Sequence, residues 1–256
     1  NSEMEKIKLE KTVFSIKDSK YIKIDKLYDS NFTNKVYLAR NLDTNEVVVI
    51  KKLRSVGKRK FYQDCLTKQL DHMKQISSKH VISVYHDSIF WNTFKTKTKD
   101  AYFITMEYSK YGDFFNLISK TQKGFPTNVA LYYFNQLIDG IQAIHKAGIM
   151  HRDIKLENIL LDKNYDLKIT DLEFADKLID EDGNYIKCQR CIGSESYIPP
   201  EMYGKEEYYG DKADIYSGGI TLYLFLNKRF PYAKATKSDS RFRSFIEDRE
   251  EYIRKN

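Results

Sequence analysis

The chain has 256 residues, of which 41% are hydrophobic, 14% aromatic and 31% charged, and its formal net charge is +7. This apolar content is sufficient for a folded core and excludes a disordered chain. The basic residues are scattered, and no aromatic residues alternate with the densest basic runs at 58–60 and 95–99. We therefore expect ordinary solvated surface at these runs and no nucleic-acid partner.

The sequence contains no signal-peptide pattern, and its most apolar stretch, 220–226, is far too short to span a bilayer. We expect an intracellular protein without a transmembrane segment, located in the cytoplasm or the nucleus. Cys188 and Cys191 form a CxxC motif, but no second cysteine pair or histidine cluster completes a zinc site. We expect reduced thiols in a loop here.

Strand patterns dominate the first 110 residues. The segment 27–40 begins as a tight turn without glycine and ends in the alternating pattern of a strand. The β-branched run 47–53 follows the turn LDTNE, which predicts a hairpin between the two. The segment 61–76 has helical periodicity, and two more strands are predicted at 80–90 and 101–108.

Helical patterns follow a connector around Gly112. A long helix is predicted with Thr127 as its N-cap and Gly148 as its C-terminal stop. Two short strands at 158–162 and 167–170 come next, then a long loop, then helices to the end. A strand-rich part, a connector and a helix-rich part together suggest a ligand site in the cleft between the parts.

Five motifs occur in one order along the chain. They are VVIK at 48–51, MHRDIKLENILL at 150–161, DLE at 171–173, GSESYIPPE at 193–201 and DIYSGGI at 214–220. In these motifs the sequence resembles the eukaryotic protein kinases of the Ser/Thr type, and the resemblance extends over nearly the whole chain.

The resemblance implies an α+β fold with two lobes that together form one kinase domain. We expect a small β-rich N-lobe at 1–108, with one main helix, and a larger helical C-lobe at 109–256. By the same resemblance we expect the last C-lobe helices to be missing from the sequence 1–256.

The resemblance also implies ATP and Mg²⁺ as cofactors and phosphoryl transfer to Ser or Thr of a protein substrate. Asp153 would orient the attacking hydroxyl and accept its proton, and Lys155 would contact the γ-phosphate. Lys51 would bind the α- and β-phosphates. Asn158 and Asp171 would hold Mg²⁺.

Further nucleotide contacts are implied on both sides of the connector. Met106 would be the gatekeeper, Glu107 to Ser109 the adenine hinge, and Asp113 a neighbour of the ribose. Ser194 occupies the position where the Ser/Thr class has threonine. The full expected nucleotide set is Val36, Val49, Lys51, Met106, Glu107, Ser109, Asp113 and Leu160, with Asp29, Asn31 and Asn34 in the phosphate loop.

The phosphate loop departs from the family pattern. Its three glycine positions fall on Asp29, Asn31 and Asn34. Asp and Asn tolerate positive φ better than most residues, so the turn could keep its shape. We expect it to lose close backbone approach to the phosphates, and Asp29 adds repulsion.

Two more departures lie near the phosphates. Gln69 takes the place of the helix glutamate that pairs with Lys51, so its amide oxygen can accept a hydrogen bond from the lysine but supplies no charge. Leu172 and Glu173 replace the phenylalanine and glycine of the D-F-G motif. Glu173 would place a carboxylate beside the metal site.

The loop before Gly193 also departs from many relatives. Arg190, which has no hydroxyl, occupies the position of their activating phosphorylation site. Arg152 would then have no phosphate to pair with at that position. Tyr185 is the nearest alternative for modification.

Two functions remain open from the sequence. Lys51, Asp153, Asn158 and Asp171 are all present, which favours an active Ser/Thr kinase with weak nucleotide binding and low activity. The altered phosphate surroundings favour a pseudokinase that acts as a binding or allosteric scaffold. Either function implies a protein substrate or a regulatory protein partner. The motif GSESYIPPE, together with the segment 229–246, also looks like the fungal kinases that regulate nutrient permeases and ion homeostasis. The oligomeric state is open.

Overall fold

The computed structural model describes residues 13–16, 19–29, 34–54, 67–68, 70–90, 101–204, 206–248, 250 and 252. The chain divides into two compact units. The sheet unit consists of Asn1–Lys74 with Ile82–Tyr108, and the helical unit consists of Gln75–Val81 with Ser109–Asn256.

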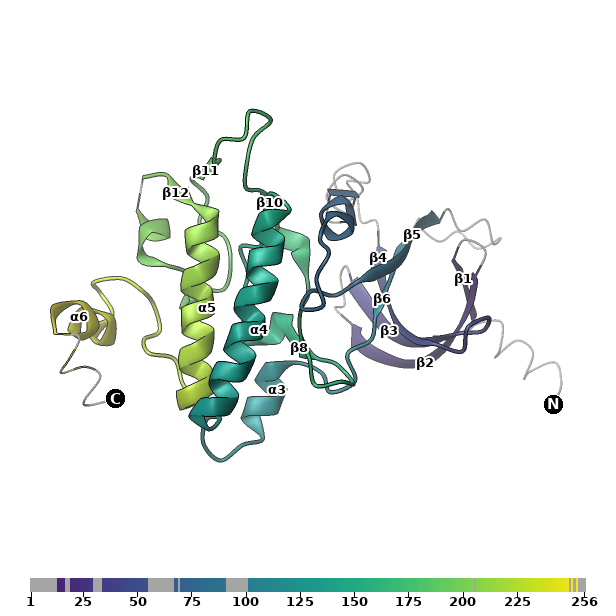
Figure 1. The fold of residues 1–256 in the computed structure, drawn as a ribbon, viewed down its shortest axis with the longest axis horizontal. Helices are drawn as coiled ribbons and strands as arrows, with labels where there is room; N and C mark the ends of the chain where they lie inside the picture. Colours follow the sequence, from purple (N-terminus) through teal and green to yellow (C-terminus); the bar gives the residue numbers. More distant parts are fainter. Residues whose placement is uncertain are drawn as a thin grey trace. The chain divides into compact units, whose positions relative to one another are not determined.

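The sheet unit is built on a six-stranded antiparallel sheet, purple to blue in Figure 1. Its strand order is β1-β2-β3-β4-β6-β5. The strands are β1 Val13–Ile16, β2 Ser19–Asp29, β3 Asn34–Asn41, β4 Val47–Arg54, β5 Val84–Phe90 and β6 Ala101–Glu107. Residues 70–75 are helical, within the predicted helix 61–76, whose residues 61–66 and 69 lie outside the described part.

The predicted hairpin is confirmed by the pairing of β3 with β4. Asn41 shapes its turn, because the Asn41 side-chain oxygen accepts the backbone N–H groups of Asp43 and Thr44 at 2.8 and 3.1 Å. Asn45 has a φ of 60°, which asparagine tolerates better than most residues. Residues within the turn itself therefore favour the reversal of the chain between β3 and β4.

Two strand boundaries differ from prediction. Leu27 and Tyr28 continue β2 instead of starting a turn, since Tyr28 pairs with Val36 on β3. The turn between these strands falls at residues 30–33, which lie outside the described part. β5 begins at Val84 and not at residue 80, because His80 and Val81 belong to the helical unit, where the His80 carbonyl accepts the Ile169 N–H.

A buried apolar cluster covers one face of the sheet. Its members are Ile16, Tyr21, Ala39, Val48, Ile50 and Phe103. Because side chains alternate along a strand, the neighbours of Val48 and Ile50 on β4 point to the opposite face. Packing on one face thus directs Val49 and Lys51 to the other.

The helical unit contains four helices and several short elements among its described residues. The helices are α3 Phe114–Ser119, α4 Thr127–Lys146, α5 Gly210–Asn227 and α6 Ser240–Glu247. The strands are β7 Ile149–Met150, β8 Ile159–Leu161, β9 Leu167–Ile169, β10 Asp176–Lys177, β11 Lys187–Cys188 and β12 Tyr208–Tyr209. The 3₁₀ turns are η1 Leu156–Asn158, η2 Leu172–Phe174, η3 Glu195–Tyr197 and η4 Pro200–Tyr203.

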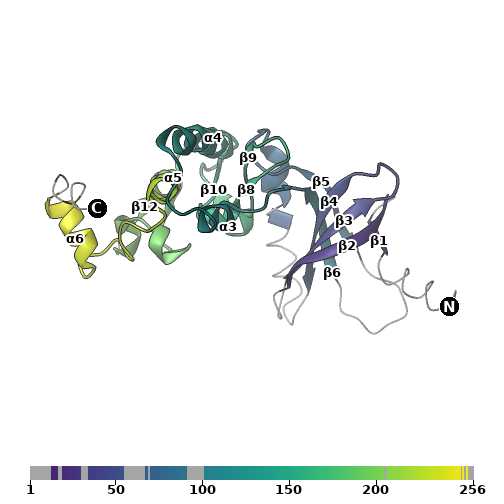
Figure 2. The same ribbon diagram turned by 90° about the horizontal axis from the view of Figure 1, so that it is seen from below.

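Helices α4 and α5 lie side by side in Figures 1 and 2 and form the centre of this unit. The C-terminal stop of α4 is confirmed, because Gly148 has a φ of 72° and donates its N–H to the His145 carbonyl at 2.9 Å. The predicted N-cap is wrong. Pro126 is the cap residue and Thr127 is the first helical residue, since the proline ring fixes an extended entry into the helix.

The segment Gln75–Val81 belongs to the helical unit through His80. Its ring Nδ1 lies 3.0 Å from the Leu167 carbonyl oxygen, and its own carbonyl accepts the Ile169 N–H at 2.8 Å. The two short strands predicted at 158–162 and 167–170 are present as β8 and β9, and the structure pairs them antiparallel. None of the helices in the described residues combines the length and the hydrophobicity that a membrane crossing requires.

Two helical glycines provide a test of this packing. A Cβ at Gly140 on α4 would lie 2.9 Å from the His80 carbonyl oxygen and 2.8 Å from Ile169 Cδ1. Gly140→Ala should therefore lower the free energy of unfolding by about 1–3 kcal/mol, although alanine is the better helix former. A Cβ at exposed Gly219 on α5 meets no atom within 4 Å, so Gly219→Ala should stabilise by up to about 1 kcal/mol.

Urea unfolding of both variants measures the contrast. A Gly140→Ala protein that is at least as stable as the parent would contradict the close contact of α4 with His80.

Candidate active site

Four of the predicted nucleotide residues share one face of the sheet. The strand register pairs Val36 with Lys51 and Val49 with Met106. Since paired residues lie on the same face, all four point away from the buried apolar cluster. Lys51 is only 8% exposed, so its ammonium group is held in a largely enclosed place.

The remaining predicted residues of the sheet unit are less fully described. Glu107 ends β6, and its carboxylate accepts a backbone N–H at 3.4 Å. Asp29 and Asn34 are the facing ends of β2 and β3, with side chains outside the described part. Asn31 and Gln69 lie wholly outside it. The altered phosphate loop and the neutral partner of Lys51 therefore stay predictions.

Asp153 is the centre of a hydrogen-bond network in the helical unit. Lys155 Nζ lies 2.7 Å from Asp153 Oδ2, and the Asn158 amide donates to the same oxygen at 2.9 Å. Ser194 Oγ donates to Asp153 Oδ1 at 3.1 Å and accepts from Lys155 Nζ at 2.9 Å. The Asp153 carboxylate is thus oriented by three side chains and is 5% exposed.

Ser194 reaches this network from a separate part of the chain. The nearby Tyr197 fixes its loop, because the Tyr197 hydroxyl accepts the Leu156 N–H at 3.3 Å and its carbonyl accepts from Ser217 Oγ at 3.0 Å. Burial raises the pKa of Tyr197 above its usual value, so the hydroxyl stays protonated. Through its hydroxyl and its carbonyl, Tyr197 joins two distant segments, a role that its sequence context alone did not indicate.

Asp214 holds the turn that leads into Asp153. It is 1% exposed, and its oxygens accept the backbone N–H groups of His151 at 2.8 Å and Arg152 at 2.7 Å. The ring Nε2 of His145 lies 2.9 Å from Asp214 Oδ2. Arg152 has a φ of 66°, a strained conformation for a non-glycine residue, and the bond from its N–H to Asp214 stabilises it.

His151 connects this turn to the residues before Asp171. Its Nδ1 accepts the Asp153 N–H at 3.2 Å, and its Nε2 lies 3.1 Å from the Thr170 carbonyl oxygen. The Thr170 N–H in turn donates to the Asn158 carbonyl at 2.9 Å. Asp171 follows with a φ of 65°, at the start of η2. Both predicted metal residues are therefore tied to one hydrogen-bonded framework.

The residues present fit Mg²⁺ held together with a nucleotide. The Asn158 Nδ2 donates to the backbone carbonyl and to Oδ2 of Asp153, both at 2.9 Å, which directs the amide oxygen elsewhere as a possible ligand. In the part of the chain that is described, no cluster of three or more His, Cys, Asp or Glu could hold a metal. A structural zinc site needs such a cluster, whereas Mg²⁺ commonly uses one or two protein ligands with phosphates and water.

The predicted nucleotide residues of the helical unit lie around α3. Asp113 forms a bridge with Leu160 and caps α3, accepting the N–H and the side-chain amide of Asn116, both at 2.7 Å. Ser109 is 6% exposed, and its hydroxyl has no hydrogen-bond partner among the described residues. The structure thus brings Asp113 and Leu160 together and gives Asp113 a structural role in addition to the predicted one.

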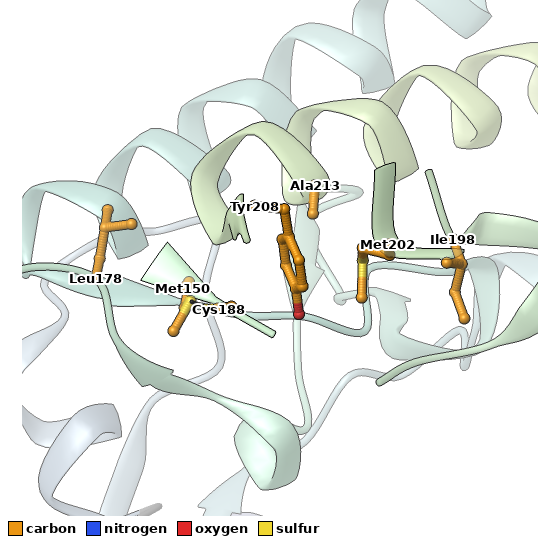
Figure 3. Packing of buried hydrophobic residues seen from close by; sticks show 7 residues of the cluster. All are labelled: Met150, Leu178, Cys188, Ile198, Met202, Tyr208 and Ala213. Carbon is orange, nitrogen blue, oxygen red and sulfur yellow. Dashed lines mark hydrogen bonds between the residues drawn. The ribbon is translucent and has the colours of Figure 1, made fainter. Parts of the chain in front are cut away.

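The long loop between β9 and α5 packs on an apolar cluster (Figure 3). The cluster consists of Met150, Leu178, Cys188, Ile198, Met202, Tyr208 and Ala213. Cys188 Sγ lies 3.5 Å from Met150 Sδ, and both Cys188 and Cys191 are free thiols. The first cysteine of the CxxC motif is therefore a core residue.

Comparison with known proteins decides the family. A family model described as protein kinase domain matches residues 32–255. This chain belongs to the protein kinase family. The predicted resemblance to eukaryotic Ser/Thr protein kinases and the α+β fold are confirmed.

Several curated kinases are similar to the chain. It is 36% identical over 203 residues to CBL-interacting serine/threonine-protein kinase 20 of Arabidopsis thaliana. The matched region covers 77% of this chain and 43% of that protein. It is 34% identical over 221 residues to CBL-interacting protein kinase 2 of Oryza sativa subsp. japonica, covering 83% and 46%. It is 38% identical over 153 residues to serine/threonine-protein kinase CHK1 of Saccharomyces cerevisiae, covering 59% and 29%. The chain spans less than half the length of these relatives.

Replacement of Asp214 tests its role in stabilising the turn that leads into Asp153. Asp214→Asn places amide N–H groups among three donors in a buried site, so it should lower the free energy of unfolding by about 2–4 kcal/mol. Asp139→Asn, on the exposed side of α4, makes the same chemical change and should have little effect. Urea unfolding followed by circular dichroism compares the two, and equal stabilities would refute the structural role of Asp214.

The two cysteines should differ in reactivity. Burial raises the pKa of the Cys188 thiol, so near neutral pH it stays protonated and shielded, whereas Cys191 is exposed. Iodoacetamide treatment of the native protein, read by peptide mass spectrometry, should label Cys191 first. In urea the two should react at similar rates. Rapid labelling of Cys188 in the folded protein would contradict its place in the cluster.

Proposed function

We propose that this chain is an active Ser/Thr kinase domain that transfers the γ-phosphate of ATP to a protein substrate, with weak nucleotide binding and low activity. The observation that carries the proposal is the Asp153 carboxylate, which Lys155, Asn158 and Ser194 orient together. A carboxylate fixed by three side chains is suited to orient a substrate hydroxyl and accept its proton.

Each residue of this network has a distinct task in the proposed reaction. Asp153 binds the incoming hydroxyl and takes its proton. Lys155 is close enough to that carboxylate to stabilise negative charge beside it, and Ser194 keeps both side chains in place. Asn158 and Asp171 would hold the metal ion. When bound, ATP with Mg²⁺ supplies the phosphoryl group and neutralises its charge.

The sheet unit would hold the nucleotide. Lys51 offers an ammonium group on the same face as Val36, Val49 and Met106, which would pack on the adenine. Enclosing an ammonium group beside apolar side chains strengthens its attraction to phosphate oxygens. We further propose that 1–108 and 109–256 act as the N- and C-lobes of one kinase domain.

A pseudokinase remains the second candidate, and one observation favours it. Glu173 is exposed beside Asp171, where its carboxylate would compete with phosphate for the metal. The glycine-free phosphate loop points the same way. In this case the chain would bind a protein partner through a kinase fold without transfer.

The class of partner is proposed from the chemistry of the site and from similarity to known kinases. The names of two relatives describe kinases that interact with CBL, and by similarity we propose a regulatory protein partner or a protein substrate for this chain. We also propose an intracellular site of action. Membership of the fungal group that regulates permeases and ion homeostasis stays a prediction.

Comparison of the parent protein with its Asp153→Asn variant tests the proposal. The substitution keeps the shape of the side chain and removes the proton acceptor, so transfer to a Ser/Thr peptide library should fall by about 100-fold or more. ATP affinity, measured by calorimetry with and without Mg²⁺, should be unchanged by the substitution and should depend on Mg²⁺. Labelled phosphate in equal amounts with both proteins would indicate a contaminant. Nucleotide binding without transfer by the parent would favour the pseudokinase.

A further inference from the structure

The guanidinium group of Arg152 already has an anionic partner within the chain. Its NH2 group donates to Asp176 Oδ2 at 3.1 Å, and its Nε donates to the Phe174 carbonyl at 2.6 Å. The side chains are 12% and 34% exposed, so the pair is partly shielded from water. Screening by salt is weaker for such a pair than for a surface pair.

The backbone positions both members of this pair. The Arg152 N–H is bound by Asp214 at 2.7 Å, which directs the arginine out of its turn. Asp176 pairs with Met150 in the β7–β10 ladder, and the Leu178 N–H donates to the Gly148 carbonyl at 2.7 Å. The main-chain arrangement therefore brings the two residues close enough for their side chains to form the Arg152–Asp176 contact.

The rest of the loop is attached to the same unit. Cys188 pairs with Tyr208 in the β11–β12 ladder, and the Tyr208 hydroxyl donates to the Arg190 carbonyl at 2.6 Å. Cys188, Leu178 and Ile198 enter the apolar cluster of Figure 3. Between Asp176 and Ile198 the loop is thus attached to the helical unit by side-chain hydrogen bonds, by strand pairing and by apolar packing.

Activation loops of many kinases are ordered when a phosphate pairs with an arginine. In this chain the corresponding loop position is Arg190, which cannot be phosphorylated on a hydroxyl and adds positive charge. We infer that the Asp176 carboxylate takes the place of that phosphate, so that the loop 176–198 docks on the helical unit without being phosphorylated. Asp176 is then a positioning residue, since it acts on Asp153 and Ser194 through Arg152 and the loop.

Hydrogen exchange tests the docking without any need for activity. The chain is dephosphorylated, its mass is verified, and exchange is followed in peptides that contain β11. Asp176→Asn keeps the oxygen that accepts the Lys177 N–H at 2.9 Å but loses the charge facing Arg152. We expect about tenfold faster exchange at β11, because a loop held by fewer contacts opens more often.

Two further variants control this experiment. Asp182→Asn removes a charge from an exposed position of the same loop and should leave exchange unchanged. Asp176→Glu restores a carboxylate and should recover at least part of the protection. Equal exchange in the Asp176→Asn and Asp182→Asn proteins would overturn the inference, and so would a parent loop that becomes protected only after phosphorylation.

The catalytic consequence rests on the proposed kinase function and is measured separately. Phosphatase treatment should leave the transfer rate of the parent unchanged, whereas Asp176→Asn should lower kcat by about tenfold or more with little change in KM for ATP. Loss of activity on phosphatase treatment would overturn the inference while the proposed function stands. If no variant transfers phosphate, the proposed function fails, and the exchange experiment still decides the docking.

Discussion

A single buried carboxylate sets the geometry on which the site depends. Asp214 is almost completely removed from water, which is costly for a charged group unless donors surround it. Here the donors are two consecutive backbone N–H groups of the turn and a histidine ring, so the same bonds that offset the cost also fix the turn. The direction of Asp153 and the outward path of Arg152 both follow from this.

From that turn, two sets of contacts spread through the helical unit. One set leads through Asp153 to Lys155 and Ser194 and brings together segments that are distant in the sequence. The other leads through Arg152 to Asp176 and to the apolar cluster under the loop. Because both sets start at Asp214, a substitution at this position would disturb the hydrogen bonds around Asp153 and also the packing of the loop. Polar networks of this kind raise the specificity of a fold only if each member is satisfied.

Local signals in the sequence were sufficient for several elements. The hairpin of β3 and β4 follows from alternation and from Asn41 and Asn45, and the end of α4 follows from Gly148. The motif residues around Asp153 could be named because their order and spacing match a known family. In each case the information lies within a few neighbouring residues or within one motif.

Contacts between distant residues could not be predicted in the same way. Nothing near Asp176 in the sequence indicates that its partner is Arg152, since the contact depends on the β7–β10 ladder. The late start of β5 has a similar cause, because His80 bonds to residues of β9 that come much later in the chain. At the start of α4 a local signal was misleading. Thr127 has a side chain suited to an N-cap, but the backbone of Pro126 places the cap one residue earlier.

The attachment of Gln75–Val81 to the helical unit has a consequence for how the protein is made. The helical unit is discontinuous in the sequence, so a ribosome completes the sheet-unit residues up to Tyr108 before the partners of His80 on β9 exist. Until then the Gln75–Val81 segment has no place to bind. A fragment that starts at Ser109 would lack this segment permanently, leaving the Ile169 N–H without its acceptor and an empty volume beside Gly140. The boundary between the units is therefore unsuitable as a place to cut the chain.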